Sequence, residues 1–409
     1  MHTTFEELLA PLSSFIEEQG NQIDENSGSR KLFFADFTNK IIFAFVMKLP
    51  SLRQLVTELS TSEVCQKLGL KETPFSTLKD GFTRFSSQDF EKLFHHILKN
   101  ASWLRIEAFD ELGIFRLVDG SVFPTLRSMD WATFRKTKKA IRLHLSFDLN
   151  SMIPVDFIGL KANSSERDFL LSIIEKGVTY IADRGYFSFD LAAKIESAKA
   201  FFILRIRNNL KLGRTISLHS SCTEGQQIPP CFKNLTDEVV RFESDETGNV
   251  YRLISFTVLQ NQFKICTNRL DLTTLQVIIL YAYRWQIELF FKFIKRSLNG
   301  LHLFNHTENG VNIQFFILMI TAVLQLKLKQ KTVLEVQQVD NNSSTINLQE
   351  VKNMEKIANY QGHQPDLWIK TLTLPLQKLW KISCHWIRCL QNFICKSFDS
   401  LVINKLGTT

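Results

Sequence analysis

The segment Tyr281-Ala-Tyr-Arg-Trp-Gln-Ile-Glu-Leu-Phe-Phe-Lys-Phe-Ile-Lys295 is the most informative stretch of this chain. At 100° per residue, its polar side chains fall in one narrow stripe of a single helix, with an apolar flank beside them. The stripe consists of Tyr281, Arg284, Glu288, Lys292 and Lys295. Such a flank packs against other elements, so we expect the stripe to border a site where the carboxylate binds a metal ion and the cations bind phosphates. The alternative is a surface helix with ion pairs four residues apart.

Two further carboxylates follow short apolar runs. The runs are Phe115-Arg-Leu-Val before Asp119-Gly and Val178-Thr-Tyr-Ile-Ala before Asp183-Arg-Gly. Runs of β-prone residues that stop at such turn residues predict buried strands with an acid at the carboxyl end, where ligands bind in open α/β sheets. Taken singly, each acid also fits a plain turn. Together with Glu288, the two aspartates favour a common site.

The three acids in these contexts resemble the DDE transposases, and within them the insertion sequence 4 family. The matching residues are Asp119 and Asp183 for the first two acidic motifs, and Tyr281, Arg284, Glu288 and Lys295 for the signature Tyr-x2-Arg-x3-Glu-x6-Lys around the third. The resemblance covers roughly residues 106–330. It implies a ribonuclease-H-like core that cuts and joins DNA at transposon ends with divalent metal ions.

The resemblance also implies roles for individual residues. Asp119, Asp183 and Glu288 would hold two Mg²⁺ or Mn²⁺ ions, one activating the attacking hydroxyl and one stabilising the leaving oxygen. The phosphate-binding residues would be Tyr281, Arg284, Lys292 and Lys295. Two alternatives stay open: a DNA-binding remnant that has no activity, and a ribonuclease-H-like host nuclease that mobilises nothing.

The pattern around the acids predicts an α/β fold, a ribonuclease-H-like mixed sheet flanked by helices. Three successive strands are expected over 114–118, 141–149 and 153–160. A helix, the Asp183 strand, a second helix and the strand 201–207 then alternate, which is the order that such a sheet requires.

Between about residues 208 and 268, short β-like runs predict a β-rich insertion ahead of the Glu288 helix. Members of the resembled family that cut through a DNA hairpin use an aromatic residue in such an insertion to hold a flipped base. This insertion contains no Trp, so that role falls to Phe242, Tyr251 or Phe256, or is absent.

Outside the core, helical spacing predicts an N-terminal helical domain over residues 1–105, which we expect to bind DNA. Residues 76–79 could open the recognition helix of a helix-turn-helix-like module, and an ordinary helical cap on the core is the alternative. The catalytic domain is expected over 106–330. In the remaining region, 331–409, the Asn-, Gln- and Ser-rich stretch 337–349 predicts a linker before further helices.

Charge favours a polyanionic partner. Lys and Arg number 49 against 41 Asp and Glu, which gives a net charge of +8 and a pI near 9.0. Two basic clusters lie next to predicted core strands: Arg135, Lys136, Lys138 and Lys139 in the first, and Arg205 and Arg207 in the second. We expect both to contact phosphates of a nucleic-acid backbone, and the resemblance implies that this is double-stranded DNA, at the terminal inverted repeats and the target. Solvated charged loops are the alternative.

Cysteine usage and hydropathy bear on the compartment. Seven cysteines without paired C-x-x-C spacing imply no disulfide framework and suit a reducing cytosol. The chain opens on a polar segment, and its longest apolar stretch, 315–324, is about half the length of a membrane span. We therefore expect a cytoplasmic protein with no membrane partner, and the family resemblance implies a bacterial host and association with the nucleoid through DNA. Paired cutting of two ends in the resembled family implies a homodimer on DNA.

Overall fold

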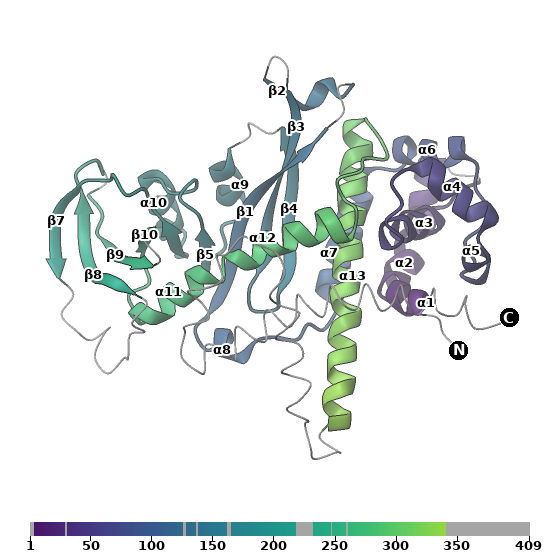
Figure 1. The fold of residues 1–409 in the computed structure, drawn as a ribbon. Coiled ribbons are helices and arrows are strands. Elements are labelled where there is room, and N and C mark those ends of the chain that lie inside the picture. Colours follow the sequence, from purple (N-terminus) through teal and green to yellow (C-terminus); the bar gives the residue numbers. More distant parts are fainter. Residues whose placement is uncertain are drawn as a thin grey trace.

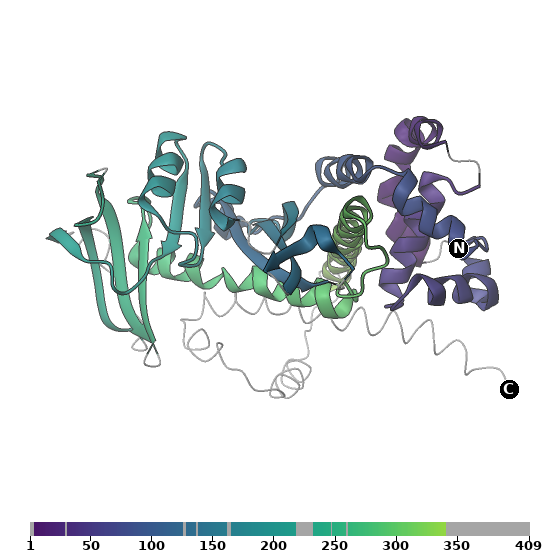
Figure 2. The same cartoon turned by 90° about the horizontal axis from the view of Figure 1, so that it is seen from above.

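The computed structural model describes residues 4–340 apart from 29–30, 126–127, 136–137, 162–164, 218–231, 247 and 259–260. The first helices form one end of the molecule and a mixed sheet forms the other. Helix α13 (Glu308–Asp340) stands between them in both views (Figures 1 and 2).

The N-terminal end is built from helices rich in phenylalanine. They are α1 (Thr4–Leu9), a 3-10 turn (Ala10–Leu12), α2 (Ser13–Ser27), α3 (Phe34–Val46), α4 (Leu52–Thr61), α5 (Glu63–Lys67), α6 (Phe75–Arg84) and α7 (Ser87–Asn100), followed by the short α8 (Glu107–Asp110). Four buried rings, those of Phe34, Phe37, Phe85 and Phe90, contact one another with centroids 4.8 to 6.4 Å apart. Such aromatic pairs stabilise a core beyond the area they bury. Residues 76–79 lie in α6, which begins one residue earlier.

The core strands and helices follow one another along the chain as predicted for a ribonuclease-H-like sheet. The core strands are β1 (Ile114–Pro124), β3 (Lys138–Asp148), β4 (Ile153–Lys161), β5 (Val178–Ala182) and β6 (Phe201–Arg205), and the short β2 (Thr133–Arg135) pairs with β3. They run in the order β4-β3-β1-β5-β6, with antiparallel pairing up to β1 and parallel pairing from β1 through β5 to β6. Helices α9 (Glu166–Ser172) and α10 (Phe189–Ser197) connect the parallel strands.

The predicted β-rich insertion continues this sheet instead of forming a separate one. Its strands are β7 (Leu212–Ser217), β8 (Lys233–Phe242), β9 (Tyr251–Val258) and β10 (Asn261–Thr267), and β10 pairs with β6. Phe242, Tyr251 and Phe256 are at most 4% exposed. Their rings pack inside the protein, so in this structure none of the three is presented to a DNA base.

The helix predicted around the signature is interrupted twice. α11 (Thr274–Ala282) and α12 (Trp285–Lys292) meet at a turn in which the Arg284 N–H bonds to the Tyr281 carbonyl, three residues back. A π-helical turn, Phe293–Ser297, then ends the segment. The expectation of one straight helix was wrong, because a tight turn and a wide turn change the rotation per residue.

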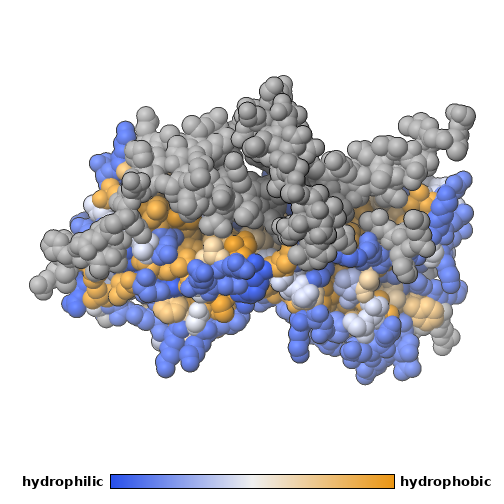
Figure 3. Space-filling model, turned by 90° about the horizontal axis from the view of Figure 1, so that it is seen from below, coloured by the Kyte–Doolittle hydropathy of each residue, from blue (hydrophilic) through white to orange (hydrophobic). Residues whose placement is uncertain are grey.

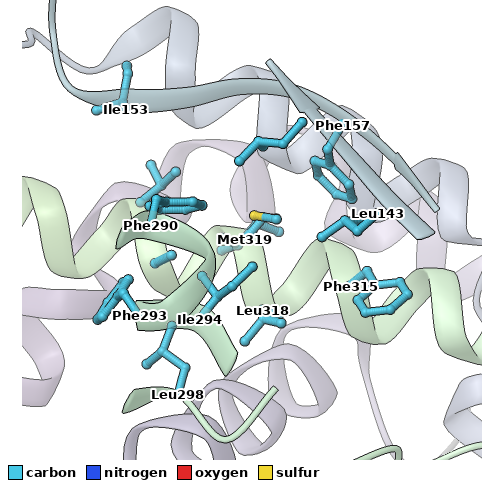
Figure 4. Packing of buried hydrophobic residues seen from close by; sticks show 14 of the residues in the cluster. Leu143, Ile153, Phe157, Phe290, Phe293, Ile294, Leu298, Phe315, Leu318 and Met319 are labelled. Atoms are coloured by element: carbon cyan, nitrogen blue, oxygen red, sulfur yellow. The ribbon is translucent and has the colours of Figure 1, made fainter. Parts of the chain in front are cut away.

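Helix α13 is the centre of the hydrophobic core. It packs on α1, α3, α6 and α7 on one side and on β4 on the other. Figure 4 shows Phe315, Leu318 and Met319 of α13 beside side chains of β3, β4, α12 and the π turn. One cluster of buried apolar residues runs from Leu8 to Leu328 and includes both ends of the molecule. We call this cluster the shared core.

Residues Glu308–Lys331 of α13 form the one helix in the described part of the chain that is long and apolar enough to cross a membrane. Its most apolar stretch is 83% buried inside the protein, as in the core helix of a globular fold. α13 also continues through residues 337–340, the start of the expected linker, and residues from 341 onward lie outside the described part. On the face seen from below, hydrophilic residues line the lower edge, and hydrophobic and hydrophilic residues are interspersed above it (Figure 3).

Candidate active site

Parallel pairing of β1 with β5 brings the first two acids together. Val118 lies opposite Ala182, so Asp119 and Asp183 follow at the same level of neighbouring strands, which are about 4.8 Å apart. β5 ends there, but β1 continues to Pro124 and stays paired with β3. The expectation that Asp119 ends its strand was therefore wrong, because hydrogen bonds to β3 carry β1 past the Asp-Gly pair.

The third acid reaches the same point from α12, which packs on β1. Arg284 lies between two of the acids: its Nη2 is 2.7 Å from Glu288 Oε1, and its Nη1 is 3.9 Å from Asp119 Oδ2. The arginine side chain is only 15% exposed. A buried cation in this position offsets the repulsion between the two carboxylates.

Asp183 is contacted from two other elements. The Tyr281 hydroxyl donates to Asp183 Oδ1 at 3.2 Å, and Arg205 Nη1 lies 4.0 Å from the same oxygen. Burial raises the pKa of Tyr281 to about 12, so its hydroxyl keeps the proton that it donates. The Arg205 guanidinium also lies over the Phe263 ring, 4.5 Å from its centroid. The second acid is thereby connected to α11, which carries Tyr281, and to the insertion, which carries Phe263.

The electrostatic setting of Asp119 is unfavourable for a bare carboxylate. Burial raises the pKa of Asp119 from 3.8 to about 6, and the charges of Glu288 and Glu166 act in the same direction. Arg284 opposes the shift, as does the Gly120 N–H, which donates to Asp119 Oδ1 at 2.8 Å. A carboxylate that is costly to ionise gains stabilisation from an added cation.

The two lysines of the predicted stripe, Lys292 and Lys295, lie in different environments. Lys295 Nζ donates to Ser121 Oγ and to the Val122 carbonyl, each at 2.7 Å, and lies 4.6 Å from the centroid of the Phe123 ring. It therefore joins the π turn to β1 just beyond the first acid. Lys292 is exposed and forms no ion pair with any residue that the structure describes.

The two predicted basic clusters also differ. Arg207 lines an open pocket of about 500 Å³ together with Arg184, Gly185, Asn208 and Asn209, next to Asp183 in the chain. In the first cluster, Lys139 is paired with Asp130. The side chains of Arg135 and Lys138, and all of Lys136, lie outside the described residues.

Glu166 and Tyr186 border the acids and were missed by the analysis of the sequence. Arg142 Nη1 donates to Glu166 Oε1 at 2.5 Å, and a Cβ on Gly185 would lie only 2.8 Å from Glu166 Oε2. Tyr186 is 1% exposed. Two local signals could have found them: Glu166 opens a helix capped by Ser165, and Tyr186 belongs to the same Asp-Arg-Gly-Tyr run as the second acid.

A family model described as "Transposase DDE domain" matches residues 112–324, just over half of the chain. The chain belongs to the DDE transposases. All three acids and the four signature residues of this transposase lie within the matched range. The resemblance to an enzyme family that acts on DNA is thereby confirmed.

Relatives carry matching names. A Geobacillus stearothermophilus protein named "Probable transposase for insertion sequence element IS5377" is 22% identical over 79% of this chain and 84% of its own length. The Sinorhizobium fredii protein "Putative transposase y4zB" is 28% identical over 52% of this chain, which spans 60% of that relative. A solved piggyBac transposase synaptic complex with hairpin DNA aligns over 91% of this chain and 88% of its own, at 9% identity and a TM-score of 0.38, too low to carry an argument.

DDE transposases in general depend on metal ions, and the donor set of this transposase fits them. Carboxylate oxygens are the ligands that Mg²⁺ prefers, and the Asp119, Asp183 and Glu288 side chains are 23 to 38% exposed. Within the described residues, no three acidic, His or Cys side chains are grouped closely enough to hold an ion as they stand. The Arg284 guanidinium lies between two of the acids and is paired with Glu288 in this structure.

Proposed function

We propose that this transposase cleaves DNA at the ends of an insertion sequence and joins those ends to a target, in a metal-dependent cut-and-paste reaction. The observation that carries the proposal is the meeting of Asp119, Asp183 and Glu288 around Arg284 and Tyr281, from segments far apart in the sequence. A group of acids that come from two neighbouring strands and a helix and face a largely buried arginine suits phosphoryl transfer.

Asp119, Asp183 and Glu288 would hold two Mg²⁺ or Mn²⁺ ions. When bound, such ions activate the attacking water or 3′-hydroxyl and stabilise the leaving oxygen. The raised pKa of Asp119 supports this assignment, because a nearby ion would relieve the cost of ionising a buried carboxyl. The protein supplies the alignment, since the register of β1 with β5 fixes two of the acids.

The phosphates flanking the scissile bond would be bound by cations around the acids. Arg284 can offer its planar guanidinium to a phosphate once it leaves Glu288, and Tyr281 would keep Asp183 oriented. Further contacts to the DNA backbone are assigned to Lys292, Lys295, Arg205 and Arg207, and to the loop that carries Arg135, Lys136, Lys138 and Lys139.

The wider assignments follow from the same reaction. Double-stranded DNA with terminal inverted repeats would be the substrate and a second duplex the target, and cutting two ends together would need a homodimer on DNA. Residues 1–105 would form a DNA-binding domain, residues 106–330 the catalytic domain, and residues 331–409 a linker and helical region. A bacterial protein that acts on chromosomal DNA in this way would work in the cytoplasm at the nucleoid.

The test uses DNA that carries the sequences flanking the coding region, where inverted repeats bounded by short direct duplications are expected. The purified full chain with Mg²⁺ or Mn²⁺ should cut at the repeat ends and join them to a target plasmid. Glu288→Gln should abolish both steps and leave DNA binding largely intact. Glu196→Gln, at an exposed position near the end of α10, is the matched control and should behave as the wild type.

The same assay separates the alternatives. Nicking without joining and without preference for the repeat ends would favour a host nuclease of the same core. Binding to the ends without cleavage at any metal concentration would favour an inactive remnant. Full activity of Glu288→Gln would remove the third acid from the proposed site.

A further inference from the structure

Tyr186 carries a polar group that is buried without a partner. The side chain is 1% exposed, and its hydroxyl makes no hydrogen bond with the part of the chain that the structure describes. Burying an unsatisfied hydroxyl is unfavourable, and most buried polar groups in folded proteins are hydrogen-bonded. A phenylalanine at this position would avoid the cost, so the hydroxyl requires a reason other than stability.

Tyr180, on the neighbouring strand β5, shows the usual solution. It is fully buried, yet its hydroxyl donates to the Ile173 carbonyl at 2.5 Å and accepts from the Glu175 N–H at 2.8 Å. The two tyrosines are therefore a matched pair. They have the same side chain and similar burial, but opposite hydrogen-bonding states.

The charged groups that act on the Tyr186 hydroxyl are those of the candidate active site. They are Asp119, Glu166, Arg142 and Arg284. Burial and the charge of Asp119 raise the pKa of Tyr186 well above its usual value, so the hydroxyl keeps its proton and can act as a donor.

The segment that carries Tyr186 is closely packed against an ion pair. Gly185, the residue before Tyr186, has room for no side chain, because a Cβ there would lie 2.8 Å from Glu166 Oε2. Glu166 is held by Arg142, and a Cβ on Gly120 would lie 3.2 Å from Arg142 Cδ. The ion pair of Arg142 with Glu166 therefore packs against Gly120 and Gly185, and Tyr186 follows Gly185 and belongs to the same buried cluster as Val118, the residue before Asp119.

Asp119 is the carboxylate that loses its arginine partner if Arg284 moves to a bound phosphate. Its Oδ1 accepts from the Gly120 N–H, whereas within the described part of the chain its Oδ2 forms an ion pair with Arg284 alone, at 3.9 Å. If Arg284 turns to a phosphate, that cation leaves the carboxylate. Glu166, by contrast, keeps its bond to Arg142.

We propose that Tyr186 is a positioning residue, whose hydroxyl donates a hydrogen bond to the Asp119 carboxylate once Arg284 has moved away, and so orients that carboxylate for metal binding. This inference rests on the proposed function of the site. Outer partners of metal-binding carboxylates orient them, and their removal typically weakens metal affinity about 10- to 100-fold.

The experiment compares Tyr186→Phe with Tyr180→Phe in the full chain. Mn²⁺ alone is titrated and followed by electron paramagnetic resonance, and thermal unfolding is measured without metal. Tyr186→Phe should weaken Mn²⁺ binding about tenfold or more and keep or raise the melting temperature, because it removes an unsatisfied buried hydroxyl. Tyr180→Phe should lower the melting temperature and leave Mn²⁺ binding unchanged, because it breaks two bonds outside the site.

A cleavage assay over a range of Mn²⁺ concentrations gives the second readout. For Tyr186→Phe, the half-saturating Mn²⁺ concentration should rise about tenfold, with a smaller fall in the rate at saturation. Wild-type Mn²⁺ binding by Tyr186→Phe would overturn the inference and leave the proposed function standing. If the wild type itself neither binds Mn²⁺ nor cuts DNA, the proposed function fails and the inference fails with it.

Discussion

At the scale of single residues, Arg284 controls the charge balance of the candidate active site. Its guanidinium contacts Glu288 directly and Asp119 at longer range, and its side chain is largely buried. This one cation does not fully compensate the acids, because the pKa of Asp119 remains raised. The ionised form of Asp119 is therefore unfavourable in this site, and a bound cation can stabilise it.

The cost of ionising Asp119 predicts a pH-dependent effect on stability. Its pKa is raised from 3.8 to about 6, so the folded state holds the proton more tightly than the unfolded state and loses stability as the pH rises from about 4 to 6. Without divalent metal, Asp119→Asn, which imitates the neutral form, should be more stable than the wild type by about 1 to 3 kcal/mol above pH 7. Urea denaturation at several pH values measures the difference.

Below about pH 4 the Asp119→Asn and wild-type proteins should be equally stable, because both carry a neutral side chain in either state. Asp190→Asn is the control: this aspartate is 71% exposed, and the change should alter stability by less than about 0.5 kcal/mol at any pH. Equal stabilities of Asp119→Asn and the wild type at pH 8 would contradict the prediction.

Lys292 and Lys295 should differ in how much each contributes to stability. Lys295→Ala removes two hydrogen bonds to β1 and should cost about 1 to 2 kcal/mol of unfolding free energy. Lys292→Ala removes an exposed side chain and should change stability by less than about 0.5 kcal/mol. If Lys292 contacts a phosphate, the slope of log affinity for DNA against log salt should fall by about 1. An unchanged slope for Lys292→Ala would remove it from the DNA-binding residues.

At the scale of elements, a buried ion pair anchors the start of α11. Arg252 in β9 contacts both carboxylate oxygens of Asp237 in β8, at 2.9 and 2.6 Å, and the two side chains are 0% and 5% exposed. The same guanidinium donates to the carbonyls of Arg269 and Leu272, in the loop before α11. The insertion thereby holds the helix pair that delivers Glu288.

Breaking this anchor should destabilise the fold strongly. Arg252→Met leaves the Asp237 charge buried and unpaired, at an expected cost of about 3 to 5 kcal/mol. Adding Asp237→Leu removes that charge, so the double variant should be more stable than Arg252→Met alone. Urea denaturation of the two single variants and the double variant measures the coupling. Arg241→Met, at an exposed position of β8, is the control. If the double variant is no more stable than Arg252→Met, the loss of stability does not come from an unpaired Asp237 charge.

At the scale of the whole molecule, α13 makes the N-terminal helices and the sheet one cooperative unit. The helix contacts α3 on one side and β4 on the other, and the shared core is continuous across it. The domain boundary proposed at about residue 105 therefore separates two regions that share one apolar core. The N-terminal helices and the catalytic core are expected to unfold together.

A substitution within α13 tests this cooperativity. Ile317 is fully buried, and Ile317→Ala should cost about 2 to 5 kcal/mol. Hydrogen exchange should then show equal losses of protection in α3 and in β4, because both pack on the same helix. Leu301→Ala, at a position that is 39% exposed, should leave both unchanged. Faster exchange in α3 with β4 unaffected would indicate two independent units.

Much of the site was predictable because its signals are local. The spacing of Tyr281, Arg284 and Glu288 and the apolar runs before Asp119 and Asp183 are patterns within a few residues, and they were enough to bring the three acids into one hypothesis. Tyr186 and Glu166 were not predicted as site residues, because a tyrosine after a glycine and a glutamate at the start of a helix are common in sequences. Their relation to the acids depends on contacts across β3, α9 and the loop after β5.

Local periodicity and turn chemistry, together with the family resemblance, were thus enough to predict the fold class and the order of the elements along the chain, since side-chain spacing depends only on backbone geometry. Pairing between distant segments decided the rest. Hydrogen bonds from β3 carried β1 through Asp119, β10 joined the insertion to the main sheet, and contacts with β1 held the end of the signature helix at Lys295. These outcomes depend on which surfaces meet when the chain folds, and no short stretch of sequence contains that information.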